Sequence, residues 1–241
     1  MAYELNGVEK SNLAFFSTDH AVNVAYNNYG LNDVEQYIVS RYFTKSKARI
    51  LDIGCGRGRT TVPLDQAGFN VTGIDISKKL VYAAASSYQD LDFRVMNACE
   101  LGFDDKSFDY VFFSFNGIDC IYPEDNRIIA LQEIYRVLAP GGLFIFSSHN
   151  SWWLPLGRKP IDLPYFLAVL TCNIHNLRMF RKYRVETTRS GSIIQYYQNP
   201  QRQKKQLNEL GFEVLETVGP FSRLLKLCEP YLHYVVRRMA L

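Results

Sequence analysis

Three glycines spaced by two, Gly54, Gly56 and Gly58, are the residues with the clearest chemical potential. They follow an apolar run that predicts a buried strand, and a helix is predicted to begin near Thr60. Glycines at such a turn permit positive φ angles and a close approach of a ligand to the backbone. Asp75 ends the next predicted strand, 21 residues after Gly54. A carboxylate there can accept hydrogen bonds from both hydroxyls of a ribose.

The spacing of these glycines argues against a dinucleotide. The fingerprint G-x-G-x-x-G/A needs a third small residue where the helix packs against the strand. That position is Arg59 when counted from Gly54 and Thr61 when counted from Gly56. The spacing therefore favours a nucleoside ligand without phosphates. Asp52, just before the loop, is expected to orient the loop or to attract an ammonium group.

Polar residues also follow two later predicted strands, in segments 114–119 and 147–150. In an open α/β sheet, ligands bind beyond the carboxyl ends of the strands. His149 is the best candidate for a general base there, because histidine titrates near neutral pH. Asp119 is a rival base, and Asn116 is suited to orient a substrate. The alternatives are a hydrogen-bonded loop histidine and an aspartate that caps the turn before the next residue.

Alternating strands and helices must position these residues. Short apolar runs without clear alternation predict buried parallel strands, and the segments between them predict helices. The fold class is therefore α/β, doubly wound. The predicted strands are 49–53, 70–74, 92–96, 110–115 and 142–147. Asn32-Asp33 can cap a helix that runs through Val34, Tyr37, Ile38 and Tyr42. Further helices are predicted from 77 to about 88 and at 126–138, the last ending at Ala139-Pro140-Gly141-Gly142.

The chain is predicted to form one domain, 1–241, in four parts. Residues 1–47 are expected to form an N-terminal helical cap and residues 48–150 the ligand-binding core. Residues 151–190 show no clear period and are interpreted as an inserted lid over the site. In residues 191–241 regular structure returns, with strands at 192–197, 213–218 and 233–237 and a helix from about Pro200 to Leu210.

Four segments at suitable spacing carry a resemblance to a known family. They are ILDIGCGRG at 50–58, VTGIDIS at 71–77, NACELGFDDKSFDYV at 97–111 and EIYRVLAPGGLFIFS at 133–147. Together they resemble the motifs of class I S-adenosylmethionine-dependent methyltransferases, well over 48–150 and loosely over 192–241. The resemblance implies a mostly parallel, seven-stranded, Rossmann-like sheet. It also implies S-adenosylmethionine as cofactor, S-adenosylhomocysteine as product, and methyl transfer as the activity.

The resemblance also implies a set of cofactor-binding residues. In addition to Asp52, they are Gly54, Cys55, Gly56 and Gly58 beside the methionine part, Asp75 at the ribose, Ile76, Asn97 and Ala98 at the adenine, and Ser114 and Phe115 at the border. Asn97 departs from the aspartate that the family often has, and a turn residue is its alternative role.

Charge is unevenly distributed along the chain. Residues 1–150 carry 13 Lys/Arg against 18 Asp/Glu, whereas residues 151–241 carry 14 against 6. The second part is therefore expected to face an anionic partner, with a solvated basic face as the alternative. The basic residues of the lid are Arg158, Lys159, Arg178, Arg181, Lys182, Arg184 and Arg189, interleaved with aromatic residues such as Trp152, Trp153 and Tyr183.

The expected acceptor is a small anionic molecule, methylated at a hydroxyl with help from His149, Asp119 or Asn116. N-methylation and RNA methylation are alternatives, although no RNA-binding module is recognisable. A non-catalytic cofactor-binding scaffold is the alternative from another class.

The setting is expected to be reducing and cytoplasmic. The five cysteines are odd in number and form no C-x-x-C pair, so neither a disulfide framework nor a metal site is predicted. No signal peptide or membrane-spanning run is recognisable, and nucleic acid is not expected as a partner. The sequence predicts no particular oligomeric state.

Overall fold

The computed structural model describes residues 5–18, 30–152, 167, 170, 171, 182–188, 191–220 and 229–239. The strands are β1 (Arg49–Ile53), β2 (Asn70–Asp75), β3 (Asp92–Val95), β4 (Phe108–Phe113), β5 (Leu138–Asn150), β6 (Tyr183–Thr188), β7 (Gly191–Gln198), β8 (Phe212–Val218) and β9 (Tyr231–Arg238). The helices are α1 (Gly7–Phe16), α3 (Asp33–Tyr42), α4 (Thr61–Gln66), α5 (Lys78–Ser87), the 3-10 helix η1 (Gly117–Cys120), α6 (Glu124–Val137) and α8 (Pro200–Glu209).

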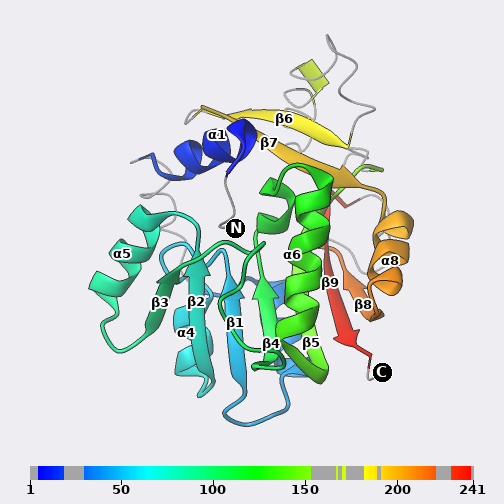
Figure 1. Cartoon of the computed structure of the whole chain (residues 1–241). Helices are drawn as coiled ribbons and strands as arrows, with labels where there is room; N and C mark the ends of the chain where they lie inside the picture. Colours follow the sequence, from blue (N-terminus) through cyan, green and yellow to red (C-terminus); the bar gives the residue numbers. More distant parts are fainter. Residues whose placement is uncertain are drawn as a thin grey trace.

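A mostly parallel central sheet confirms the predicted α/β, doubly wound class (Figure 1). Strands β1 to β5 run parallel in the order β3-β2-β1-β4-β5. Strand β9 continues the sheet antiparallel to β5, and β8 pairs with β9. These seven strands match the predicted number. The described sheet nevertheless has nine strands, because the β6–β7 hairpin joins it through the last two residues of β5.

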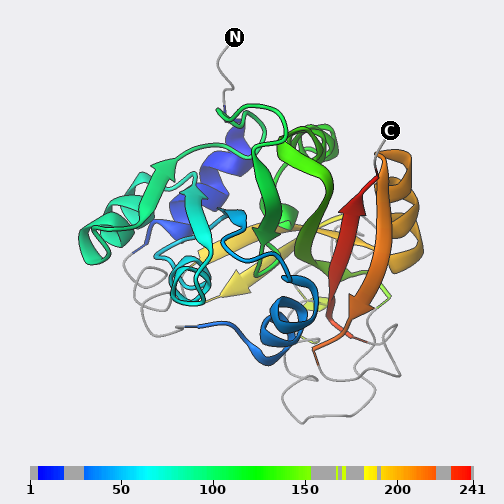
Figure 2. The ribbon, with the colours of Figure 1, turned by 90° about the horizontal axis from the view of Figure 1, so that it is seen from below.

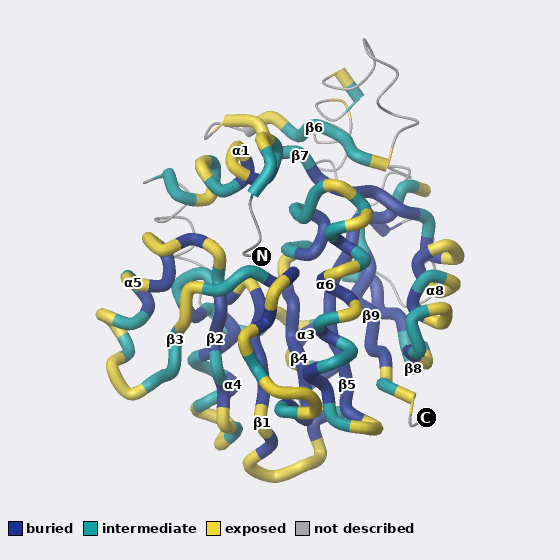
Figure 3. The backbone as a smooth tube through the Cα atoms, in the orientation of Figure 1, coloured by how far each residue is buried: buried dark blue, intermediate teal, exposed yellow. Residues whose placement is uncertain are grey.

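Each face of the sheet buries its own apolar core. One core joins Val111 and Phe144 to Leu131 and Ile134 of α6. The other joins Phe112 and neighbouring strand residues to α3 and α4. Figure 2 shows α6 on one side of the sheet and α3 on the other, and Figure 3 shows the strands as the most buried part. Because both faces are covered, the strands read as continuous apolar runs.

Local sequence signals place the helix starts. Asn32 caps α3 in a capping box with Glu35, and Ser77 caps α5. Asn199 caps α8, whose first residue is the predicted Pro200. These caps set the points at which the chain leaves the sheet, so they also set the loops at its carboxyl edge.

Two expectations about the strands need correction. Residues 114 and 115 were expected in the fourth strand, but β4 ends at Phe113 because Phe115 and Asn116 take positive φ angles of 52° and 53°. The lid was expected to lack regular structure, yet its end forms strand β6, which pairs with β7. Most of the lid lies outside the described residues.

Candidate functional site

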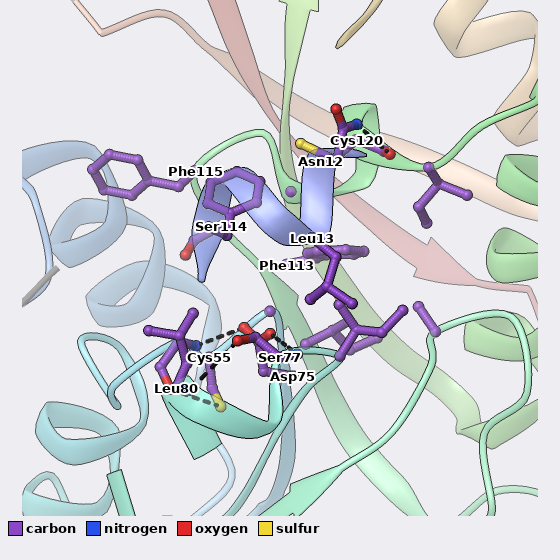
Figure 4. Close-up of a pocket in the computed structure, with 18 of the residues that line it drawn as sticks. Asn12, Leu13, Cys55, Asp75, Ser77, Leu80, Phe113, Ser114, Phe115 and Cys120 are labelled. Atoms are coloured by element: carbon purple, nitrogen blue, oxygen red, sulfur yellow. Dashed lines mark hydrogen bonds between the residues drawn. The ribbon is translucent and has the colours of Figure 1, made fainter. Parts of the chain in front are cut away.

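A cavity of about 490 Å³ opens at the carboxyl ends of β1, β2 and β4, beneath α1 (Figures 1 and 4). Its size is that of a small-molecule site. Its walls are mostly apolar, with polar groups near the glycine loop. The lining residues are Glu9, Asn12, Leu13, Phe15, Phe16, Ile53, Gly54, Cys55, Gly56, Arg57, Arg59, Thr60, Asp75, Ile76, Ser77, Leu80, Met96, Asn97, Ala98, Phe113, Ser114, Phe115, Gly117, Cys120 and Ile121.

The three glycines of the loop have different surroundings. Gly54 and Gly56 line the cavity with φ angles of 66° and 56°. A side chain at Gly56 would meet no atom within 4 Å, so this backbone is open to a ligand. Gly58 is different, because a Cβ there would lie 3.0 Å from Phe93 and 3.3 Å from Val62. Gly58 therefore serves packing and does not line the cavity, contrary to its expected place beside the methionine part.

Asp75 lies at the cavity, where the sequence placed it (Figure 4). Its Oδ2 accepts the N–H of Gly56 at 3.0 Å, and its Oδ1 accepts the N–H of Ser77 at 2.8 Å. Each oxygen keeps a further lone pair for a hydroxyl donor. Burial raises the pKa of Asp75, while the two backbone N–H groups oppose that shift. The carboxylate therefore ties the glycine loop to the end of β2 and still faces the cavity.

The far side of the cavity is suited to an aromatic base. Ile76, Met96 and Ala98 give it an apolar wall. Asn97 also lines the cavity, but its Oδ1 accepts the N–H of Cys99 at 2.9 Å. This is the turn role that was the alternative for Asn97. Its amide nitrogen is the group that can still meet a ligand.

Asp52 lies beneath the loop and is not among the lining residues. Its side chain is fully buried, and Oδ2 accepts the hydroxyls of Thr60 and Thr61, both at 2.6 Å. Burial raises the pKa of Asp52 to about 6, because the two hydroxyls compensate only part of the lost hydration. Of its two expected roles, Asp52 therefore performs loop orientation.

A strained loop after β4 forms another wall of the cavity. Ser114 and Phe115 line it, as expected, and the Phe115 ring is 64 % exposed. The Arg59 guanidinium lies 4.4 Å from the centroid of that ring and donates to Ser114 Oγ at 2.8 Å. Arg59 is held by buried Glu35 at 2.7 Å. The sequence marked Arg59 only as a residue that excludes a dinucleotide, and its role in holding this loop was missed.

The three candidate catalytic residues form one network. His149 Nδ1 lies 2.8 Å from Asp119 Oδ2, whose other oxygen accepts the Ser148 hydroxyl at 2.8 Å. Because a carboxylate only accepts, Nδ1 carries the proton and Nε2 is left as an acceptor. Nε2 lies 3.3 Å from the Asn116 Nδ2. His149 and Asp119 are therefore partners, whereas the sequence analysis treated them as rivals.

Helix α1 covers the cavity, and the sequence analysis named none of its residues. Its Asn12 side chain donates to the carbonyls of Cys120 and Ile194 at 3.1 and 2.8 Å, and it accepts the N–H of Ile194 at 3.0 Å. Figure 4 shows Asn12 beside Cys120 at the cavity edge. A capping box of Asn6 and Glu9 begins the helix, and its N-x-x-E spacing was the available sequence signal.

Other expectations concern metals, membranes and the lid. Among the described residues, no group of three or more His, Cys, Asp or Glu is placed to hold a metal ion. In the same part of the chain, no helix has the length and apolarity to cross a membrane. Most of the expected basic lid, including Arg158, Arg178 and Arg181, lies outside the residues that the structure describes.

Comparisons with known proteins agree with this geometry. Residues 51–146 match the family model described as a methyltransferase domain. An O-methyltransferase of Aspergillus sclerotiorum is 34 % identical over 109 residues, which are 42 % of this chain and 40 % of that protein. The matched segments span about half or less of the lengths of such curated relatives.

Solved structures share the fold over most of the chain. An S-adenosylmethionine-dependent methyltransferase of Methanosarcina mazei has a TM-score of 0.67 at 18 % identity, covering 88 % of this chain and 99 % of that one. The 1,6-didemethyltoxoflavin-N1-methyltransferase of Burkholderia thailandensis, with bound S-adenosylhomocysteine, has a TM-score of 0.65 at 17 % identity, covering 100 % and 94 %.

Residues 51–146 are thus similar to a methyltransferase domain, and the chain has the fold of S-adenosylmethionine-dependent methyltransferases, as its motifs predicted. The cofactor of this family is S-adenosylmethionine, and the cavity fits it. Gly56 leaves open space for the methionine part, Asp75 faces the cavity as a hydroxyl acceptor, and Ile76 and Ala98 offer an apolar wall to adenine.

Proposed function

We propose that this protein transfers a methyl group from S-adenosylmethionine to a hydroxyl of a small, acidic molecule. The observation that carries the proposal is the Asn116–His149–Asp119 network at the carboxyl end of β5. The activity itself is part of the proposal, because a fold can serve several functions. Bound S-adenosylmethionine supplies an electrophilic methyl group on a positively charged sulfur.

The chain supplies binding, alignment and proton removal. The glycine loop and Asp75 hold S-adenosylmethionine at the end of the sheet, while α1 limits access of water to the cavity. His149 Nε2 accepts the proton of the acceptor hydroxyl, which replaces the 3.3 Å contact with Asn116. Asp119 keeps the Nδ1 proton in place, so the basic nitrogen points away from the carboxylate. Asn116 orients the acceptor, since the residues on either side of it, Phe115 and Gly117, line the cavity.

An acidic acceptor is supported by charge. The second part of the chain has an excess of Lys and Arg, and one of these residues, Arg184, lies beside the His149 network through Tyr197. A positive group near the acceptor site favours a negative ligand.

The test combines binding with transfer. We expect calorimetric titration to show binding of both S-adenosylmethionine and S-adenosylhomocysteine. With radiolabelled cofactor and a panel of hydroxy acids, His149→Ala should lower kcat by about 100-fold or more. Its affinity for S-adenosylhomocysteine should stay within about twofold, because the side chain does not line the cavity. Ser107→Ala, a change on an exposed loop, is the control.

Other results would point elsewhere. Full activity of His149→Ala would remove the base role and favour an amine acceptor, which needs less help from a base. Cofactor binding without transfer to any acceptor would favour the scaffold function. Absence of cofactor binding by the folded protein would contradict the proposal.

A further inference from the structure

The β6–β7 hairpin has two faces with different neighbours. Tyr183 and Tyr196 lie opposite each other in the register, and their ring centroids are 5.2 Å apart on the face near α6. Because side chains alternate along strands, Arg184, Gln195 and Tyr197 lie together on the other face. Figure 1 shows the hairpin across the carboxyl end of the sheet, next to α1.

The Arg184 face borders the candidate site. The Tyr197 ring stacks on His149 with a centroid distance of 4.7 Å and an interplanar angle of 30°. The Gln195 side chain hydrogen-bonds the thiol of Cys120, and Cys120 lines the cavity. The hairpin therefore contacts both a residue that lines the cavity and His149.

Arg184 forms no ion pair with any residue that the structure describes. Its guanidinium carbon lies 4.6 Å from the Tyr197 ring centroid. Within that part of the chain, its buried Nε has no hydrogen-bond partner. Glu186 lies two positions along the same face but forms no ion pair with it. Burial lowers the pKa of Arg184, and Tyr197 opposes that shift.

Arg127 provides a contrast within the same protein. It is fully buried, yet its guanidinium donates to Gln203 and Gln206 at 2.8 and 2.9 Å and lies 3.8 Å from Asp119. Its Nε lacks a hydrogen-bond partner, as that of Arg184 does, but both terminal nitrogens of Arg127 are paired, whereas no hydrogen bond of the Arg184 guanidinium is found among the described residues. A partly buried, unpaired guanidinium lowers stability and is best explained by a ligand that completes it.

Two acceptor atoms near the His149 network are also unsatisfied. Within the described part of the chain, Gln195 Oε1 and Asn116 Oδ1 are buried without a hydrogen-bond partner. Both atoms are acceptors, so they are suited to hydroxyl donors. Together with the Arg184 Nε, these two acceptors are suited to form a polar ligand subsite beside His149.

We propose that Arg184 binds a carboxylate of the methyl acceptor and that the acceptor is a small hydroxy acid. This inference rests on the proposed function and names the substrate class of the same site. One planar guanidinium of unit charge matches a carboxylate, which it can hold through two parallel hydrogen bonds. A phosphate dianion would call for more positive charge. Since Tyr197 contacts both Arg184 and His149, the carboxylate and the reacting hydroxyl are separated by about one aromatic ring.

The test uses matched acids and amides. The full chain, saturated with S-adenosylhomocysteine, is titrated with 2-, 3- and 4-hydroxybenzoate and with the three corresponding carboxamides. We expect at least one acid to bind wild-type protein at least tenfold more tightly than its amide. Arg184→Gln should abolish this preference. Lys182→Gln is the matched control, since Lys182 stands just before the same strand but pairs with Glu124; it should keep the preference.

A second readout needs no ligand. Because an unpaired buried charge is removed, Arg184→Gln should raise the Tm of the ligand-free protein by about 2–4 °C. A lower Tm would show a structural arginine and overturn the inference. Equal binding of every acid and its amide to wild-type protein, including no binding of either, would also overturn it. Failure of S-adenosylhomocysteine to bind is scored separately and contradicts the proposed function instead.

Discussion

At the residue scale, two aspartates near the glycine loop are held by different groups. Asp52 is fully buried and accepts two threonine hydroxyls. Asp75 accepts two backbone N–H groups and faces the cavity. The hydroxyl donors of Asp52 come from Thr60 and Thr61, so Asp52 holds the start of α4 against the end of β1. The backbone donors of Asp75 hold the glycine loop against the end of β2. Asp52 therefore supports the loop, whereas Asp75 is the carboxylate that can contact a ligand.

Asp52 predicts a pH dependence of stability. Its folded-state pKa is about 6 against an ordinary value of 3.8, a shift that corresponds to about 3 kcal/mol. Because the folded pKa is raised, folding takes up a proton between these values, and stability is lost as the pH rises through 6. Asp52→Asn should therefore be more stable than wild type at pH 8, and the difference should shrink towards pH 4.5.

Urea denaturation at several pH values measures this difference. Asp90→Asn, a change at an exposed position, is the control and should follow the wild-type profile. A constant difference between Asp52→Asn and wild type from pH 4.5 to 8 would show that Asp52 does not titrate in this range.

At the element scale, helix α1 closes the cavity through a few polar contacts. Asn12 bonds a carbonyl at the end of η1 and both backbone groups of Ile194 in β7. The C-terminal end of α1 is joined to α5, since Ser17 Oγ lies 3.2 Å from Ser77 Oγ. The helix therefore bridges elements that are far apart in the sequence, directly over the glycine loop.

Asn12→Ala should loosen this cover. Three hydrogen bonds are lost and buried backbone groups are left unsatisfied, at a cost of about 1–3 kcal/mol. We expect faster hydrogen exchange in residues 7–16 and a several-fold weaker affinity for S-adenosylhomocysteine. Ser11→Ala, on the exposed side of the same helix, is the control. Unchanged exchange in Asn12→Ala would mean that the apolar contacts of α1 suffice.

Arg127 joins α6 to three other elements. Beyond Gln203 and Gln206 of α8 and Asp119 of η1, it lies 4.5 Å from the Tyr196 ring centroid in β7. Because Arg127 is fully buried, its partners would lose their hydrogen bonds and charge compensation without it. The same guanidinium lies behind the carboxylate that orients His149, so this cluster supports both folding and the candidate base.

Arg127→Ala should lower the free energy of unfolding by about 3–5 kcal/mol, because a buried ion pair loses one partner. Arg202→Ala, at an exposed position of α8, should change it by less than about 0.5 kcal/mol. Chemical denaturation of both variants makes the comparison. A loss below about 1 kcal/mol for Arg127→Ala would contradict the structural role of this arginine.

At the scale of the whole molecule, the cavity links ligand binding to stability. It is built from α1, the glycine loop, the ends of β2 and β3 and the loop after β4. These parts are distant in sequence and meet at the cavity. A ligand that binds only the folded chain therefore stabilises all of them together.

S-adenosylhomocysteine at about 100 times its Kd should raise the unfolding free energy by about 2.7 kcal/mol. At the same ligand concentration, Asp75→Asn should gain about 1.4 kcal/mol less, which is a tenfold loss of affinity. Thermal denaturation with and without ligand measures both. Asp90→Asn should keep the wild-type gain. An equal gain in Asp75→Asn would remove Asp75 from the ribose contact.

The sequence by itself determined the fold class, most element positions and the family. Period, caps and glycine turns are local, so Asn32, Ser77 and the run before Gly54 could be interpreted without tertiary contacts. The predicted place of Asp75 followed from parallel strands ending at one edge. The expected lining by Ile76, Ala98 and Ser114 is likewise seen in the cavity.

The tertiary structure decided what depends on contacts between distant segments. Gly58 faces Phe93 of β3 rather than the cavity. This contact joins residues 35 positions apart, so no local sequence pattern predicts it. Asp119 and His149 are 30 residues apart, so only the adjacency of η1 and β5 makes them partners. The sequence also did not reveal which side chains contact Arg184. Its contact with Tyr197 and the missing partner of its Nε, within the described residues, depend on the pairing of β6 with β7.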